Sequence, residues 1–188
     1  MKSVDIILLA AGASKRFGSQ KLLADFYGKP LYQYAFEAAA QVEFCRVLVV
    51  TNLADIQAAA KGFGFIPVES PLSYQGISAS IHAGVHAARE NAVLSFFVCD
   101  QPGFSGTDYR KFLLGFLDSG CPLGRVYCDG RPGSPTVFSP SFRKELLSLT
   151  GDEGGKGIFA NRKEETFFYP VSAKSLVDYD TPWKSVSE

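Results

Sequence analysis

Continuous runs of apolar residues alternate, in the first half of the chain, with stretches in which apolar residues recur every three or four positions. The continuous runs predict strands at residues 4–10, 46–51, 65–68 and 93–99. The helical period lies between them, at residues 31–40, 54–61 and 78–90. Repeated strand–helix units of this length predict an α/β fold in which helices cover both faces of a mostly parallel sheet.

The pattern becomes looser after Asp100. From there on it predicts a helix, a strand, a tight turn and a second strand, at residues 107–117, 124–128, 129–130 and 136–138. These elements predict a small β-ribbon appended to the sheet. Residues 130–135 are too irregular for a helix and too short for an interdomain linker. A chain of 188 residues that is 46% hydrophobic is long enough for one well-packed core, so we expect a single domain over residues 1–188.

The loop after the first strand combines glycines with cations. Gly12 and Gly18 allow backbone N–H groups to approach phosphate oxygens, and Lys15, Arg16 and Lys21 add positive charge. This combination favours a polyphosphate ligand, and the alternative is a solvated surface turn. The glycine spacing fits neither a Walker loop nor a dinucleotide fingerprint.

A carboxylate follows the fourth predicted strand. Asp100 comes directly after an apolar run and before Gln101-Pro102, which ends strand pairing. In open α/β sheets ligands bind beyond the carboxyl ends of the strands, so Asp100 and the cationic loop are expected in one crevice. A carboxylate there suits a hard cation such as Mg²⁺, and the alternative is a helix or turn cap.

Overall charge and apolar length exclude several partners. Nineteen basic and nineteen acidic side chains cancel, so no global field attracts nucleic acid or an anionic membrane. The apolar run at residues 6–11 is preceded by Asp5 and is far shorter than the roughly 20 residues that span a bilayer. We therefore expect a cytoplasmic protein that binds neither nucleic acid nor membrane.

Cysteine and histidine offer little metal chemistry. The four cysteines form no Cys-x-x-Cys pair, so a zinc site or a disulfide framework is not expected. His82 and His86 stand four apart on a predicted helix without the glutamate of a zincin motif. An ordinary helix face is the favoured interpretation of this pair, and a metal pair is the alternative.

Residues 9–21 resemble a known family pattern, L-A-A-G-x-S-x-R-M-G-x-x-K, with Phe17 in place of Met. This pattern is typical of the MobA/MocA-like NTP transferases, which build the molybdenum cofactor dinucleotides, and most closely of their CTP:molybdopterin cytidylyltransferase branch. The resemblance implies a Rossmann-like three-layer α/β/α sandwich of the nucleotide-diphospho-sugar transferase type. It also implies catalytic roles for Arg16, Lys21 and Asp100, with Asp100-Gln101-Pro102 similar to the magnesium-binding motif of the family.

A second segment, Gly76 to Gly84, resembles the family's G-M-S-S-S-L-x-x-G beside the nucleotide, and Ser78 or Ser80 is also expected to be a helix N-cap. The resemblance thus implies a nucleotide site formed by residues of both segments: Leu9, Ala10, Ala11, Gly12, Ser14, Arg16, Lys21, Gly76, Ser78 and Ser80. Ser70-Pro71 departs from the family's Asn-Pro, which leaves the base and ribose contacts of that loop open.

The C-terminal residues 177–182 resemble the family's D-I-D-T-P element. Asp178 and Asp180 lie two apart on an extended segment and point the same way, so either is a candidate second metal ligand. We favour Asp180 together with Asp100 as the Mg²⁺ ligands, and capping of a final helix is the alternative for Asp180.

The acceptor side of the cleft is implied by residues 151–157, which resemble the family's G-D-x-G-x-R. This assigns acceptor binding to Asp152, Gly154 and Lys156, with Lys156 replacing an arginine that grips phosphate in a bidentate manner. Ser134 likewise replaces the histidine of the family's Gly-His-Pro. The alternative for residues 151–157 is a glycine-rich loop at a helix start.

Together these features predict transfer of CMP from CTP to the phosphate of molybdopterin, with release of pyrophosphate and Mg²⁺ as cofactor. Ala11 stands where GTP-using relatives carry glycine, so CTP is favoured over GTP. The resemblance implies a molybdoenzyme of the xanthine dehydrogenase type as a partner. The alternatives are a cytidylyl- or guanylyltransferase acting on a sugar, polyol or isoprenoid phosphate, a non-catalytic molybdenum cofactor-binding protein, and a plain Rossmann-like cofactor binder.

Overall fold

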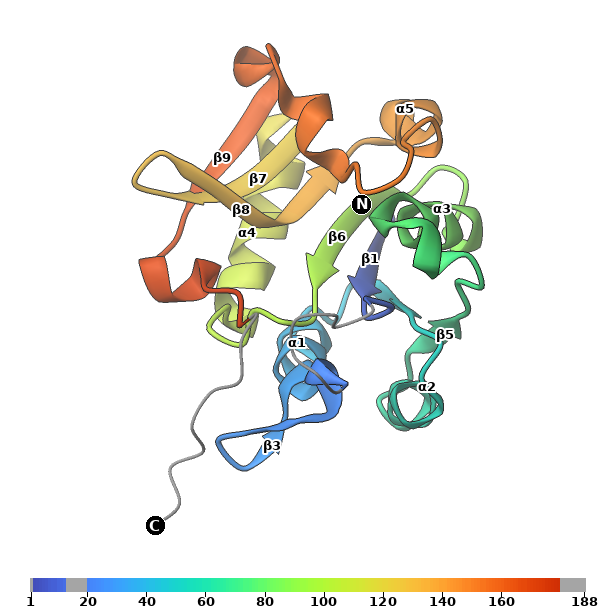
Figure 1. The fold of residues 1–188 in the computed structure, drawn as a ribbon. Coiled ribbons are helices and arrows are strands. Elements are labelled where there is room, and N and C mark those ends of the chain that lie inside the picture. The colour runs from blue at the N-terminus through green and yellow to red at the C-terminus, as the bar shows by residue number, and fades with distance from the viewer. Residues whose placement is uncertain (1, 13–19, 180–188) are drawn as a thin grey trace.

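A seven-stranded sheet forms the centre of the computed structural model, which describes residues 2–12 and 20–179. The strand order is β5-β4-β1-β6-β8-β7-β9 (Figure 1). The strands have the following bounds: β1 Val4–Leu9, β4 Arg46–Val50, β5 Ile66–Val68, β6 Val93–Val98, β7 Leu123–Cys128, β8 Arg131–Phe138 and β9 Thr166–Pro170. A separate two-stranded sheet pairs β2 (Asp25–Phe26) with β3 (Lys29–Pro30).

The sheet is mostly parallel, as predicted. Strands β5, β4, β1 and β6 pair in parallel, β8 pairs antiparallel with both β6 and β7, and β9 is parallel to β7. Among the described strands of this sheet, β8 alone runs against the others. The predicted ribbon is the β7–β8 hairpin, which extends the sheet beyond β6.

Helices cover both faces of the sheet. The α-helices have the following bounds: α1 Leu31–Ala40, α2 Ala54–Gly62, α3 Ile77–Ala87, α4 Gly106–Ser119 and α5 Arg143–Leu147. Six short 3-10 helices complete the described part: η1 Lys21–Leu23, η2 Ser73–Gln75, η3 Pro140–Phe142, η4 Gly155–Phe159, η5 Lys163–Glu165 and η6 Ala173–Leu176. Within residues 2–12 and 20–179, no helix is both long and apolar enough to cross a bilayer.

Alternation of side chains along the strands builds one apolar core on each face. On β1, Ile6 and Leu8 pack with α1, α2 and α4, whereas Ile7 between them packs with α3 and α5. Because β1, β4 and β6 are buried on both faces, their sequences read as continuous apolar runs. The pattern that predicted strands therefore follows from double burial.

Several elements differ from the sequence prediction, among them α5 and the short 3-10 helices, which were not predicted. The β2–β3 hairpin has two residues on each strand, too few to show a period. Strand β9 lies at the sheet edge and is held by its parallel pairing with β7. Strand β8 begins at Arg131, so the irregular stretch before Thr136 is extended and pairs with the last residues of β7.

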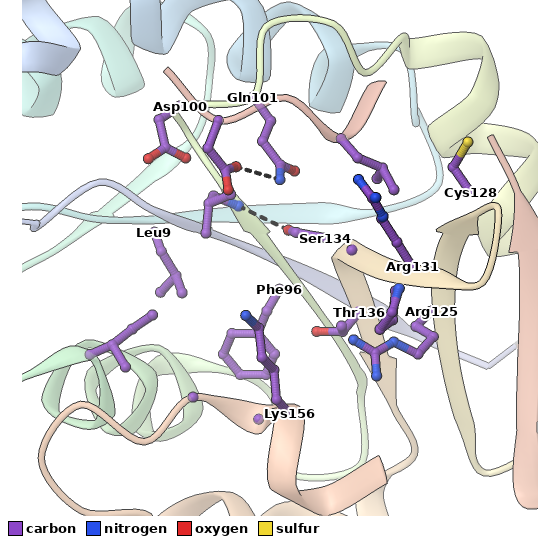
Figure 2. A pocket seen from close by; sticks show the side chains of 18 of the residues that line it. Leu9, Phe96, Asp100, Gln101, Arg125, Cys128, Arg131, Ser134, Thr136 and Lys156 are labelled. Atoms are coloured by element: carbon purple, nitrogen blue, oxygen red, sulfur yellow. Dashed lines mark hydrogen bonds between the residues drawn. The ribbon is translucent and has the colours of Figure 1, made fainter. Parts of the chain in front are cut away.

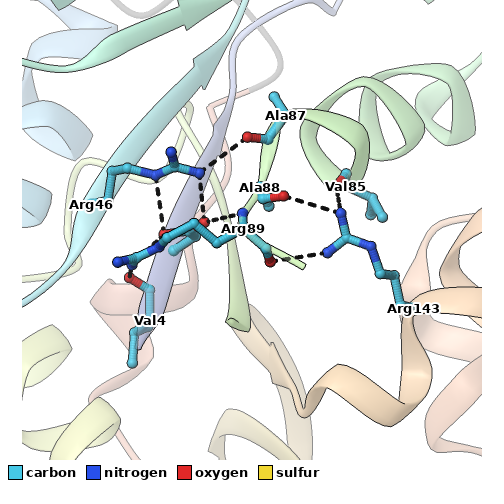
Figure 3. A network of polar contacts seen from close by, with 8 residues as sticks. Val4, Arg46, Val85, Ala87, Ala88, Arg89 and Arg143 are labelled. Atoms are coloured by element: carbon cyan, nitrogen blue, oxygen red, sulfur yellow. Dashed lines mark hydrogen bonds and ion pairs between the residues drawn. The ribbon is translucent and has the colours of Figure 1, made fainter. Parts of the chain in front are cut away.

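A buried carboxylate joins β1 to its neighbours (Figure 3). Asp5 is fully buried and accepts hydrogen bonds from Arg46 Nη2 at 2.8 Å, from the Arg89 backbone N–H at 2.7 Å and from Arg89 Nε at 2.9 Å. Burial raises the pKa of Asp5, but the hydrogen bonds from Arg46 and Arg89 outweigh it, so the net pKa lies below the ordinary value. Arg143 donates to the Val85, Ala88 and Arg89 carbonyls at the end of α3.

Candidate active site

The carboxyl ends of β1 and β6 form the topological switch point of the sheet. From β1 the chain continues to β4 and β5 on one side, whereas β6 pairs on the other side of β1. Connections therefore leave the two neighbouring strands in opposite directions, which opens a crevice where ligands bind in such folds. The loop that begins at Ala10 and the loop that begins at Cys99 both start at this crevice.

Lys21 and Asp100 form an ion pair in the crevice. The Lys21 Nζ atom lies 2.8 Å from Asp100 Oδ2, and the two side chains are only 10% and 24% exposed. Lys21 opens η1, and the next residue, Leu22, is buried in the core and anchors that turn. Two residues that the sequence assigned to phosphate and metal are therefore in direct contact.

The rest of the first loop is described only in part. Leu9 and Ala11 are half-buried, Ala10 is buried and Gly12 is exposed. The predicted site residues Ser14 and Arg16 lie outside the described residues, as does Asp180.

A cavity of about 910 Å³ opens beside Asp100 (Figure 2). Its polar lining carries both signs of charge and includes Asp100, Gln101, Asp178, Asp129, Arg125, Arg131 and Lys156, with Asp100 and Lys156 on opposite sides of the view. The apolar lining includes Leu9, Ile77, Ile81 and Phe96. This space is large enough for a small-molecule substrate, and its lining offers both carboxylates and cations.

The C-terminal segment contacts the loop that carries Asp100. The Gln101 Nε2 atom donates to Asp178 Oδ1 at 2.6 Å, and the Tyr179 backbone N–H donates to the Asp100 carbonyl at 3.3 Å. Asp178 therefore lines the same cavity as Asp100. Of the two carboxylates weighed from the sequence, Asp178 is the one within the described residues.

The donor set at this end suits a metal that arrives with a nucleotide. Residues 2–12 and 20–179 contain no group of three or more His, Cys, Asp or Glu side chains placed to hold a metal. Asp100 and Asp178 supply carboxylate oxygens, and Mg²⁺ commonly uses one or two carboxylates together with substrate phosphates and water. The residues present therefore fit a divalent ion that completes its coordination with phosphate oxygens.

The N-terminus of α3 is held differently from the prediction. We expected Ser78 or Ser80 to cap this helix, but the N-cap is Gly76 and it makes no side-chain capping bond. Both serines are buried inside the helix. The Ser78 backbone N–H instead donates to the Gly151 carbonyl at 3.1 Å, so a backbone group from a distant loop takes the place of a side-chain cap.

Gly76 allows the α3 start and the loop around Gly151 to approach closely. Its φ is +123°, and a Cβ atom on it would lie 2.2 Å from the Gly151 carbonyl oxygen. This contact places the predicted acceptor loop beside α3. Gly154 and Lys156 line the cavity, whereas Asp152 is exposed and lies outside the lining.

Two polar contacts near the carboxyl ends of the strands were missed by reasoning from the sequence. Asn52 Nδ2 donates to the Ser70 carbonyl at 2.8 Å and its Oδ1 accepts from the Ser70 N–H at 2.9 Å, which fixes the loop that departs from the family pattern. The Ser134 Oγ atom accepts from the Val98 N–H at 3.3 Å and so ties β8 to the end of β6. Neither contact has a local sequence signal, because each joins distant segments.

Arg125 was also missed, although a signal was present. It lies within the apolar strand β7, in phase with Leu123, which is fully buried. Arg125 is only 6% exposed and lines the cavity. A single cation at a position that alternation places on the buried face of an apolar strand indicates a functional residue, because charged side chains are seldom buried.

Comparison with known proteins identifies the class. The profile of the MobA-like NTP transferase domain family matches residues 6–166. Because this match covers most of the chain, the chain belongs to this family and is a nucleotidyltransferase. A search of curated protein sequences found no match.

Solved structures share the fold. Rv0371c from Mycobacterium tuberculosis H37Rv is 20% identical with a TM-score of 0.80, over 96% of this chain and 94% of that chain. A structure of Rv0371c in complex with manganese is 18% identical with a TM-score of 0.72, over 90% and 88%. CMP:2-keto-3-deoxy-manno-octonic acid synthetase, in complex with CTP, is 16% identical with a TM-score of 0.72, over 97% and 94%.

Proposed function

We propose that this nucleotidyltransferase transfers CMP from CTP to the phosphate of molybdopterin, with Mg²⁺ as the cofactor. The observation that carries the proposal is the contact between Lys21 and Asp100 at the switch point, where a cation and a carboxylate share one crevice. Merely holding a cofactor does not require this pairing. A nucleoside triphosphate needs both groups, because its phosphates carry negative charge and bring a divalent ion.

The reaction joins two phosphates. An oxygen of the acceptor phosphate attacks the α-phosphorus of CTP and forms a new P–O bond. The bond between the α-phosphorus and its bridging oxygen breaks, and pyrophosphate leaves with the electron pair. Little covalent chemistry falls to the protein, so positioning and charge neutralisation account for most of the catalysis.

The side chains of the site divide these tasks. Lys21, with Arg16 from the same loop, neutralises the charge that develops on the departing pyrophosphate. Asp100, with Asp178 or Asp180, would hold Mg²⁺, which when bound supplies positive charge to the phosphate oxygens. Gln101 donates to Asp178 and so orients that carboxylate in the cavity. The partly buried crevice strengthens these electrostatic interactions relative to bulk water.

The nucleotide and the acceptor occupy opposite ends of the site in this proposal. Residues 9–12 and the start of α3 contact the nucleotide, and the methyl group of Ala11 narrows the floor under the base, which favours the smaller pyrimidine. Gly154 and Lys156, which line the cavity, contact the acceptor. A molybdoenzyme of the xanthine dehydrogenase type would receive the product.

A sugar-type acceptor is the second candidate. Two observations favour it: Ser134 and Lys156 replace the family's histidine and arginine, and a protein with the same fold is named as a CMP-sugar acid synthetase and was solved with CTP. Under this alternative the nucleotide site is unchanged and only the acceptor differs.

Pyrophosphate release tests both candidates. It is measured with CTP, GTP, ATP and UTP, each with and without molybdopterin and Mg²⁺. The proposal expects release with CTP only when molybdopterin and Mg²⁺ are both present. Release with a sugar phosphate but not with molybdopterin would establish the second candidate. Binding of the molybdenum cofactor without turnover of any nucleotide would contradict both and indicate an accessory protein.

A further inference from the structure

Arg125 places a buried positive charge in the lining of the cavity. Its residue is only 6% exposed, and its side chain belongs to the cavity lining. Arg125 pairs with Thr136 of β8, and Figure 2 shows the two side by side, away from Asp100. The neighbouring residue, Val126, is buried in the core on the opposite face of the sheet, so the strand phase directs Arg125 toward the cavity.

This buried charge is not compensated within residues 2–12 and 20–179. The side chain of Arg125 makes no ion pair or hydrogen bond there, and its Nε atom is buried without a partner. Arg131 and Lys156 also line the cavity and add positive charge to it. Asp129, at the exposed tip of the hairpin, also lines the cavity, but its carboxylate accepts from the Cys128 thiol and makes no ion pair with Arg125 within the described residues.

A single aromatic ring supports the guanidinium. The Cζ atom of Arg125 lies 4.5 Å from the centroid of the Phe159 ring, a cation–π geometry that holds the guanidinium in place. This contact offsets only part of the free energy that burial of a charge costs, and it satisfies no N–H donor. Burial lowers the pKa of Arg125, in line with a desolvated site. The donors remain available to a ligand with lone pairs.

Strand register separates Arg125 from the reacting phosphates. Phe96 of β6 pairs with Thr136 of β8, which pairs with Arg125 of β7. Arg125 is thus two strand spacings, about 10 Å, from β6, and Asp100 lies four residues further along the direction of β6. A group that contacts Arg125 is therefore not the group that attacks the nucleotide at Asp100.

We propose that Arg125 binds an anionic group at the end of the acceptor remote from its reacting phosphate, so that the preferred acceptor carries negative charge at both ends. The assignment of the cavity to the acceptor rests on the proposed function, whereas the anion site itself rests on the burial, the missing partners and the position of Arg125. A guanidinium suits carboxylate or phosphate oxygens because it offers two parallel N–H donors.

Anion binding by the full chain without nucleotide tests the site. The probes are inorganic phosphate and acetate, titrated by calorimetry in a chloride buffer against wild type, Arg125→Gln, Arg125→Lys and Arg110→Gln. Arg110 is an exposed arginine on α4, so Arg110→Gln is the control that removes one positive charge outside the cavity. Lys21→Ala separates phosphate bound at the nucleotide end from phosphate bound at Arg125.

We expect Arg125→Gln to weaken binding of the preferred probe by about 10-fold or more, since a charge-assisted bidentate contact is lost. Arg125→Lys keeps the charge but loses the two parallel N–H donors, so its affinity is expected to lie between those of wild type and Arg125→Gln. Arg110→Gln is expected to bind the probes with the affinity of wild type. Binding of phosphate alone indicates a second phosphate on the acceptor, and binding of acetate indicates a carboxylate. Equal affinity of wild type and Arg125→Gln for both probes would overturn the site.

Thermal unfolding distinguishes a ligand-binding role of Arg125 from a structural one. It also shows whether each variant folds. Arg125→Met occupies most of the same space without a buried charge, so its Tm without anion is expected to equal or exceed that of wild type. Phosphate is expected to raise the Tm of wild type more than that of Arg125→Met. A lower Tm of Arg125→Met would show that Arg125 is structural. CTP binding is measured on the same variants. Its absence in wild type would contradict the proposed function and leave the Arg125 result intact.

Discussion

The ammonium of Lys21 contacts the carboxylate of Asp100 at 2.8 Å although the two residues are 79 positions apart. The contact joins the end of the first loop to the end of β6. It places the cation proposed to neutralise phosphate next to the carboxylate proposed to hold the metal. In the proposed reaction the triphosphate lies between these two side chains.

Loss of the Lys21 charge is expected to slow the chemical step. Lys21→Ala should reduce kcat by about 10² or more, because a preorganised cation that stabilises the leaving pyrophosphate is removed. The measurement is pyrophosphate release at saturating CTP, with Lys111→Ala on the exposed face of α4 as the control. Near-normal turnover in Lys21→Ala would remove the catalytic assignment.

The methyl group of Ala11 is expected to set the base preference. Wild type should favour CTP over GTP in kcat/KM, and Ala11→Gly should reduce this preference by about 10-fold, the scale of one methyl group in a pocket. Rates with the two nucleotides are compared in both proteins. Equal use of CTP and GTP by wild type, or an unchanged ratio in Ala11→Gly, would be incompatible with this role.

The buried Asp5 is expected to make stability dependent on acid. Its pKa in the folded protein lies below the ordinary value of 3.8, so its contribution is complete above that pH and is lost as pH falls through the folded pKa. Asp5→Asn should cost about 2–4 kcal/mol of unfolding free energy at pH 7, since it breaks a buried ionic network. The difference from wild type should shrink below about pH 3.8.

Urea unfolding between pH 2 and 7, roughly the range over which carboxylates titrate, measures this difference. Glu69→Gln, at an exposed carboxylate, is the control. A constant difference between wild type and Asp5→Asn across the whole range would exclude a pKa-linked contribution.

Replacement of Gly76 by a residue with a side chain is expected to destabilise the protein, because the backbone of another loop lies very close to Gly76. In Gly76→Ala the new Cβ would lie 2.2 Å from the Gly151 carbonyl oxygen at a φ of +123°, so the backbone must move. We expect a loss of about 2–4 kcal/mol in urea unfolding and weaker CTP binding, because the start of α3 shifts. Gly157→Ala, where a Cβ meets nothing within 4 Å, is the matched control. Equal stability of the two variants would contradict the importance of this contact.

Much of the fold was readable from local patterns. The helix predicted at residues 31–40 has those bounds, and the strand predicted at residues 93–99 is β6, which ends at Val98. The spacing of apolar residues shows which face of a strand or helix is buried. That face is formed by residues close together in the sequence, so the spacing can be read without knowing the fold. Strand β9 was missed although its residues Thr166 to Tyr169 are of types that favour strands; its pairing with β7 at the sheet edge is a long-range contact that the sequence does not show.

The prediction that Ser78 or Ser80 caps α3 was wrong for a related reason. Serines near a helix start are typical caps, but here the Gly151 carbonyl from a distant loop takes that place and the serines are buried. Long-range contacts therefore overrode a local preference.

By itself, the amino-acid sequence determined the α/β class and the approximate positions of most strands and helices. It also showed the cationic loop after the first strand and the carboxylate of Asp100 after the fourth predicted strand. Only the tertiary structure decided that Lys21 reaches Asp100, that Asp178 lines the same cavity, and that Arg125 lines it with its Nε atom unpaired among the described residues. The reason is physical. Apolar periodicity depends on neighbours along the chain, whereas contact between side chains depends on the order and register of strands that are distant in sequence.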